Sequence, residues 1–190
     1  AVGDVTKGNL LLTATGEVKT TGTIGENTYF LGEGSVLNRE TEQDGYTEVA
    51  DRFLVASIGS DAYTTLEAAV NAATDGDTVK LLSDVTLDDY LIFNKNITLD
   101  LDGHTLTSNY VMGTTRGENY AIRFTAGGTI TDSAAEKGEL VATKARAVNA
   151  AGGVLTLKDA TVRVTDDGVS SGNAVIGTNN GLVMTNSKVY

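Results

Sequence analysis

The residues of this chain that come nearest to a chemical site lie between positions 100 and 104. Asp100, Asp102 and His104 occupy alternate positions, and His104 is the only histidine. On a β-strand the two carboxylates would share one face, where they could bind a divalent cation such as calcium or act as an acid/base pair. Asp102-Gly103 is also a turn signal, and a turn would take His104 off that face. We therefore assign no catalytic residue and no metal site, and we keep Asp100 and Asp102 as candidates for calcium binding.

Basic and aromatic side chains provide the remaining candidate chemistry. A polysaccharide lyase needs a base and groups that neutralise a sugar carboxylate. Arg123 and Arg146 lie near equivalent positions of two successive repeats, and we expect them to stack as a solvated ladder on one face. Without tryptophan, tyrosines would have to form any sugar-stacking platform. The candidate bases are Arg116, Arg123, Lys144, Arg146 and Arg163, and the candidate tyrosines are Tyr90, Tyr110 and Tyr120.

Composition favours a folded, mostly β protein. The 190 residues include 22 glycines and neither proline nor cysteine. Many short strands joined by tight turns fit this composition better than a helical bundle does. The absence of cysteine excludes disulfides, thiol nucleophiles and thiolate metal sites. A net charge of −11 disfavours nucleic acid as a partner, and no run reaches the roughly 18 apolar residues that a membrane helix needs.

One stretch, residues 61–107, specifies the architecture. Thr64 and Glu67 have the spacing of a helix capping box. This predicts a helix over 64–74, with Thr64 as its N-cap, Thr65 as its first helical residue and Gly76 as the stop that follows it. Apolar residues then recur at helical spacing along one stripe, and after Gly76 they alternate with polar residues as in strands. The stripe consists of Leu66, Ala69, Val70 and Ala73. Because so short a helix cannot bury its stripe alone, we predict that it caps the open end of the strands, with Thr64, Leu66, Glu67 and Val70 forming the cap.

The second half of the chain is repetitive. Two segments align at one constant offset, which matches Ala147 with Ala174 and Leu155 with Leu182. An earlier copy starts at Ala121. Short strands repeated at intervals of about 20 to 50 residues indicate a solenoid in which each rung stacks on the previous one. The apolar anchors of these rungs are predicted to be Ile97, Ile130, Leu155 and Leu182.

The sequence of residues 56–190 resembles a known class of domain. The resemblance is carried by residues 56–59, 63–70, 75–82 and 96–107, including the run Asn96-Ile-Thr-Leu-Asp-Leu-Asp-Gly-His-Thr-Leu-Thr107. It is to right-handed parallel β-helix domains of bacterial cell-surface proteins in the pectate-lyase-like superfamily. The resemblance implies an all-β, right-handed parallel β-helix with one short N-terminal capping helix. It implies little chemistry, because such domains serve enzymes as well as adhesins and stalks.

Residues 1–55 form a β-rich segment that precedes the solenoid of 56–190. We expect strands at 9–13 and 17–20, loops with short strands over 21–52, and a strand from Phe53 to Ile58 with a turn at 59–61. Residues 8–15 resemble residues 181–187 of the last repeat. A strand at the start of the chain could therefore pack between subunits, adding to the last rung of another molecule.

The function that we predict is that of an extracellular bacterial surface module, structural or adhesive and not an enzyme. The last rung has no cap of its own, so it could be a joining surface through which copies assemble head to tail into filaments. The residues assigned to assembly are Leu10, Leu11, Leu12, Leu182, Met184 and Val189. The alternative is a carbohydrate-active enzyme, a lyase or a glycoside hydrolase, or a glycan-binding domain on the same scaffold. The expected partners are further copies of the chain and a glycan or host-surface ligand, without membrane insertion.

Overall fold

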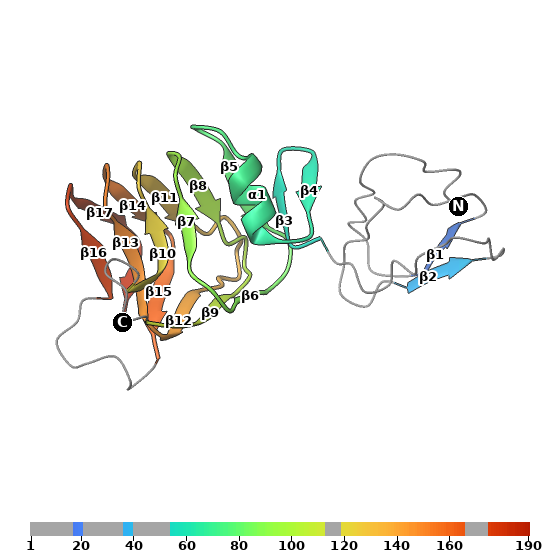
Figure 1. The fold of residues 1–190 in the computed structure, drawn as a ribbon. Coiled ribbons are helices and arrows are strands. Elements are labelled where there is room, and N and C mark those ends of the chain that lie inside the picture. Colours follow the sequence, from blue (N-terminus) through green and yellow to red (C-terminus); the bar gives the residue numbers. More distant parts are fainter. Residues whose placement is uncertain (1–16, 21–35, 40–53, 113–118, 166–174) are drawn as a thin grey trace.

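The chain is mostly β-structure with one short helix. The computed structural model describes residues 17–20, 36–39, 54–112, 119–165 and 175–190 (Figure 1). In these ranges the only helix is α1 (Leu66–Ala72), so the predicted all-β class with one helix is confirmed. None of the described residues belongs to a helix long and apolar enough to cross a bilayer.

The segment before residue 54 contributes one pair of described strands. β1 (Glu17–Thr20) pairs in parallel with β2 (Val36–Arg39). The prediction of a strand at 17–20 is therefore confirmed. The strand predicted at 9–13 lies outside the described residues.

The rest of the described chain forms three sheets, and from β5 onward successive strands belong to these sheets in rotation. The first has the order β16-β13-β10-β7, the second β17-β14-β11-β8-β5-β3-β4, and the third β18-β15-β12-β9-β6. The strands of the first sheet are β7 (Leu91–Phe93), β10 (Tyr120–Phe124), β13 (Arg146–Ala150) and β16 (Ile176–Thr178). Those of the second are β3 (Ala56–Ile58), β4 (Asp61–Tyr63), β5 (Thr78–Leu81), β8 (Ile97–Asp100), β11 (Gly128–Thr131), β14 (Leu155–Lys158) and β17 (Leu182–Thr185). Those of the third are β6 (Val85–Leu87), β9 (Leu106–Val111), β12 (Leu140–Lys144), β15 (Thr161–Val164) and β18 (Lys188–Val189).

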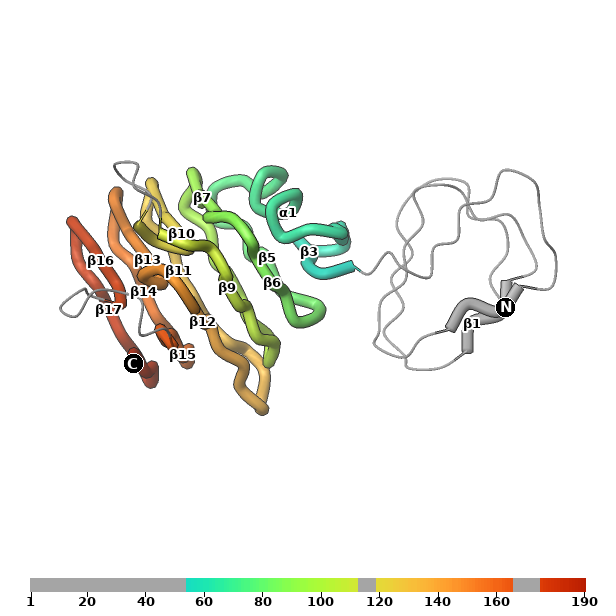
Figure 2. The backbone as a smooth tube through the Cα atoms, turned by 60° about the horizontal axis from the view of Figure 1, so that its bottom comes forward, coloured from blue at the N-terminus to red at the C-terminus, as the bar shows by residue number. Residues whose placement is uncertain are grey.

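From β5 onward each sheet grows by parallel addition. From β8 onward, each strand pairs with the strand three places earlier in the chain, and all of these pairs are parallel. Successive turns of the chain thus lie side by side as layers (Figure 2). Each layer supplies backbone partners to the next, so the hydrogen bonds of the short strands are almost all made between residues far apart in sequence.

Side chains of equal register form rows that run through the layers. In the second sheet one row joins Val79, Leu99, Ile130, Leu157 and Met184. All but Met184 are fully buried. The matching row of the third sheet runs through Val85, Leu106, Leu140, Val162 and Val189. Buried residues of all three sheets and of α1 belong to one hydrophobic core.

The register of the repeat differs from the sequence alignment at two places. The constant offset is confirmed where Leu155 pairs with Leu182. In the first sheet, however, Val148 pairs with Ile176, the position after the Val175 that the offset predicted. The predicted anchor Ile130 was wrong, because Ile97 pairs with Gly128. Ile130 belongs instead to the neighbouring row, between Leu99 and Leu157.

Gly128 explains this error. It occupies an inward position between Ile97 and Leu155, where an apolar side chain is expected. A Cβ at Gly128 would lie 2.5 Å from the ring of Phe124, which is fully buried and stacks on Phe93 at 4.5 Å between centroids. The phenyl ring of the preceding strand thus fills the space that a side chain at position 128 would take.

The N-terminal end of the second sheet is closed by a hairpin and the helix. β3 pairs antiparallel with both β5 and β4, and α1 packs Leu66 and Val70 into the core. The turn between β3 and the helix was predicted at 59–61, but Asp61 already belongs to β4. That short strand was missed because three residues carry almost no periodicity.

The helix is shorter than predicted at both ends. Its N-cap is Thr65 and not Thr64, since the Thr65 hydroxyl accepts a hydrogen bond from the Ala68 N–H at 3.1 Å. The third helical residue is therefore Ala68, and Glu67 is one position too early to close a capping box. At the other end the chain leaves the helix at Ala73, before the predicted stop at Gly76.

Candidate functional site

The edge formed by β16, β17 and β18 is the most exposed apolar part of the described stack. Leu182 is 37% exposed, Val183 51% and Met184 43%. Their partners on β14 at the two inward positions, Leu155 and Leu157, are fully buried. In each of the three sheets, the outermost described strand pairs on one side only.

Leu182 and Met184 lie on the same side of their sheet as the buried core residues. Leu182 and Met184 extend the rows of Leu155 and Leu157, which are inward rows. Val183 pairs with Thr156, a half-buried outward residue. Leu182 and Met184 therefore lie on the inward side of β17, and Val183 lies on the outer face of the same strand.

Among the predicted assembly residues, the structure brings together those of the last repeat. Leu182 and Met184 share β17, and Val189 of β18 is half-buried against the core. Leu10, Leu11 and Leu12 lie outside the described residues.

Polar side chains join the last two layers at one corner. Asn186 and Asp159 both have positive φ, at 48° and 54°, a conformation that Asn and Asp tolerate better than most residues. The Asn186 amide donates to the Asp159 carboxylate at 2.7 Å, and the Ser187 hydroxyl accepts from the Ala160 N–H at 3.2 Å. Stacked turns of equal shape thus hold the layers in register.

The carboxylates of Asp100 and Asp102 are engaged in hydrogen bonds and an ion pair within the protein. Asp100 is 7% exposed and accepts from the N–H groups of Asp102 and Ser133 at 3.1 and 2.9 Å. Asp102 forms an ion pair with Lys80 at 2.8 Å. The predicted turn is present, because Asp102 and Gly103 both have positive φ. Each carboxylate therefore has protein partners already.

The His104 side chain lies near a different carboxylate, that of Asp84. Its Nδ1 lies 3.7 Å from Asp84 Oδ1, and the same oxygen accepts from the Thr105 N–H at 2.7 Å. In the part of the chain that the structure describes, no three carboxylate or imidazole side chains are grouped so as to hold a metal ion. The geometry around Asp100 and Asp102 thus gives no support to calcium binding there.

The most deeply buried carboxylate of the described residues, Asp132, was not singled out from the sequence. It is 1% exposed and accepts from the N–H groups of Gly103, Ala134 and Gly138 at 3.0, 3.1 and 2.7 Å. It thereby fastens the loop after β11 to the turn after β8. A usable signal was present, since Asp132, Asp159 and Asn186 directly follow β11, β14 and β17.

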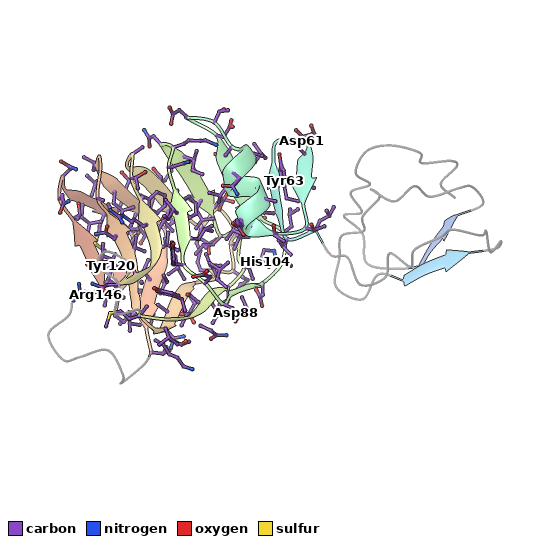
Figure 3. All side chains as sticks on the ribbon, viewed as in Figure 1. Asp61, Tyr63, Asp88, His104, Tyr120 and Arg146 are labelled. Carbon is purple, nitrogen blue, oxygen red and sulfur yellow. The ribbon has the colours of Figure 1, made fainter. Side chains whose placement is uncertain are left out.

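The basic side chains do not form the predicted ladder. Arg123 pairs in register with Asn149, whereas Arg146 pairs with Tyr120, so the two arginines are not equivalent. The Arg146 guanidinium lies 5.4 Å from the centre of the Tyr120 ring and donates to its hydroxyl at 3.2 Å (Figure 3). Arg116, the first of the candidate bases, lies outside the described residues.

Arg163 forms a charged pair that links two layers. Its Nε donates to Glu139 at 3.0 Å, and a second nitrogen contacts the other oxygen of the same carboxylate. These hydrogen bonds and the Glu139 charge raise the pKa of Arg163. An arginine held in this way stays protonated and is unsuited to act as a base.

A pocket of about 350 Å³ lies between the start of α1 and the connection from β6 to β7. Its lining residues include Glu67, Asp84, Asp88, Asp89 and Tyr90. Tyr90 meets Tyr110 edge to face, with centroids 5.5 Å apart. The charge of this lining would repel the carboxylates of an acidic polysaccharide.

Comparisons of the chain with protein-family models, with curated proteins and with solved structures found no match.

Proposed function

We propose that this chain is a structural or adhesive module of an extracellular bacterial surface, built as a right-handed parallel β-helix of the pectate-lyase-like kind. The β-helix is supported by the cyclic order of the three sheets, by their parallel growth and by the shared core. The right hand is the one that parallel crossovers adopt almost without exception. The cysteine-free composition is compatible with an extracellular bacterial setting.

A scaffold role is favoured over catalysis by the way polar groups are used. Asp100, Asp102 and Asp132 hold turns together through backbone N–H groups and a lysine. Arg163 is paired with Glu139. The pocket beside α1 has the wrong charge for the acidic polysaccharides that lyases cleave. The hydrogen bonds and ion pairs of the aspartates and of Arg163 all stabilise the stacked sheets, and none of them requires a catalytic role.

The observation that carries the proposal is the exposure of the apolar side chains of Leu182 and Met184. These side chains continue buried rows of the core yet are exposed by 37% and 43%. Apolar edge strands of this kind are sites for the addition of further β-structure. We propose that copies of the chain join there, head to tail, into filaments.

The test compares inward with outward substitutions on one strand. The double variant Leu182→Lys/Met184→Lys should abolish concentration-dependent association, measured by light scattering and electron microscopy, because it places charge in the joint. The matched control is Val183→Lys, which adds charge to the outer face of β17 and should leave association intact. A wild-type protein that stays monomeric at every concentration would contradict the proposal, and so would equal effects of the inward and outward variants.

A further inference from the structure

We infer that Asn180 is a site of spontaneous covalent modification, at which its side-chain amide is lost through attack by the backbone nitrogen of Gly181. Asn180-Gly181 is the only Asn-Gly pair of the sequence. Glycine at the second position favours this reaction, because it has no Cβ to hinder the approach of its nitrogen to the preceding side chain. The inference goes beyond the proposed function and does not depend on it.

The reaction needs only the chain and water. The Gly181 nitrogen bonds to Cγ of Asn180, the bond from Cγ to Nδ2 breaks, and ammonia leaves with the proton of the attacking nitrogen. The product is a cyclic imide, in which Cγ and the backbone carbonyl carbon of Asn180 flank the same nitrogen. Water then opens the ring at either carbonyl and leaves aspartate or isoaspartate at position 180. In isoaspartate the backbone runs through the side chain and is longer by one carbon atom.

The turn that contains this pair is open to water. Residues 179–181 connect β16 to β17, and all of them are exposed. The corresponding turn of the preceding layer, residues 151–154, lies between two described turns, yet it is exposed at Gly153 and at Val154. Turns at this corner are therefore accessible inside the stack as well as in its last described layer.

The Asn180 side chain is held loosely. Its amide nitrogen lies 3.5 Å from the carbonyl oxygen of Ala151, which is longer than an ordinary N–H···O hydrogen bond. The amide of the neighbouring Asn179 lies closer to the same oxygen, at 3.3 Å. Rotation of the Asn180 side chain toward the next backbone nitrogen therefore breaks only a weak contact with the preceding layer.

The Thr178 hydroxyl engages the attacking nitrogen. Its Oγ1 accepts from the Gly181 N–H at 3.0 Å and from the Asn180 N–H at 3.3 Å, and the hydroxyl donates to the Gly181 carbonyl at 3.0 Å. The Gly181 nitrogen must break this hydrogen bond and lose its proton before it can attack. Thr178 thus slows the reaction from within the turn, and its removal should accelerate it.

Two Asp-Gly pairs of the described chain are held in a different way. The N–H of Gly76 donates to the Asn96 carbonyl at 2.8 Å, and the N–H of Gly103 donates to the buried Asp132 carboxylate at 3.0 Å. In both cases the acceptor belongs to another layer, so the stack itself fixes the glycine nitrogen. Gly181 N–H is instead held by a hydroxyl of its own turn, which follows the movements of that turn.

The test is to incubate the purified chain in mildly alkaline buffer and to locate the modified residue by tandem mass spectrometry. Asn180 should convert to a mixture of aspartate and isoaspartate with release of ammonia, while Asn179 keeps its amide because asparagine follows it. Thr178→Ala should raise the rate about fivefold, the factor that corresponds to the loss of a typical hydrogen bond. The matched control is Thr178→Ser, which keeps the hydroxyl and should react at the wild-type rate.

An intact Asn180 in the wild-type chain and in Thr178→Ala would overturn the inference. So would aspartate without isoaspartate, because that product means direct hydrolysis by water and no attack by Gly181. Equal acceleration at Asn179 and Asn180 would overturn the role of Thr178, since the variant would then merely loosen the turn. If circular dichroism shows that Thr178→Ala does not fold, the isoaspartate content of the wild-type chain and the intact Asn179 amide decide the question.

Discussion

A series of alanine substitutions along one inward row provides the sharpest test of the stacked core. The row consists of Val79, Leu99, Ile130, Leu157 and Met184. Its inner members have a row neighbour on both sides and no exposed surface, while Met184 has a neighbour on one side only among the described strands and is 43% exposed. The cost of truncation should therefore fall abruptly at the end of the row.

The magnitudes follow from burial. Removing a fully buried Leu or Ile side chain costs about 2 to 5 kcal/mol, which combines lost transfer energy with the cavity left behind. Ile130→Ala and Leu157→Ala should fall in this range, a large part of the roughly 5 to 15 kcal/mol that stabilises a typical domain. Met184→Ala creates no enclosed cavity and should cost about 1 kcal/mol.

The assay is urea unfolding followed by circular dichroism, at protein concentrations low enough that no association is detected. Thr129→Ala serves as control, because Thr129 lies beside Ile130 in β11 but is only half-buried and points outward. Its cost should stay below about 1 kcal/mol. Equal costs for Met184→Ala and Ile130→Ala, or a Thr129→Ala variant as unstable as Ile130→Ala, would refute the assignment of this row to a common interior.

Two further predictions concern single positions. Gly128→Ala should destabilise the protein by about 1 to 3 kcal/mol, because its Cβ would lie 2.5 Å from the Phe124 ring; thermal melting should show partial recovery when Phe124→Leu is added, and no recovery would contradict the steric explanation. Hydrogen bonds from the backbone N–H and the hydroxyl of Thr74 lower the pKa of Asp77 below its ordinary value of 3.8. The stabilisation by Asp77 is therefore complete above that value and is lost as the pH falls through the lower pKa of the folded state. Asp77→Asn should flatten the acid side of the stability profile in pH-dependent unfolding, and an unchanged slope would show that other carboxylates dominate.

Local signals predicted most of the strands and the helix, but they did not fix every boundary. The alternation around Ile97 and Leu99 identified a strand and its inward face, and Asp102-Gly103 identified a turn. The N-cap was wrong by one residue because Thr64 and Thr65 are adjacent candidates, and only the backbone decides which hydroxyl reaches Ala68. Local pattern could not choose between them.

The register of the repeat could not be predicted because one residue was matched by apolar character alone. Ile130 was aligned with Ile97 and Leu155, whereas the structure places Gly128 in that row. A glycine at an inward position makes sense only once the Phe124 ring is known to fill its space. The same limit applies to Asp132, since its three N–H partners come from Gly103, Ala134 and Gly138, and one of these lies in another layer.

The stability of the layer that contains β17 and the proposed assembly both depend on Met184. The free-energy cost of Met184→Ala, measured at several protein concentrations, therefore tests both. If a second copy covers β17, Met184 acquires a neighbour on its open side and becomes equivalent to Leu157. A binding event of this kind stabilises the folded state increasingly as the protein concentration rises above the dissociation constant. The cost of Met184→Ala should then rise with concentration toward that of Leu157→Ala, whereas the cost of Leu157→Ala stays constant. A concentration-independent cost at Met184 would mean that the row ends at β17 in solution, whatever larger particles the protein forms.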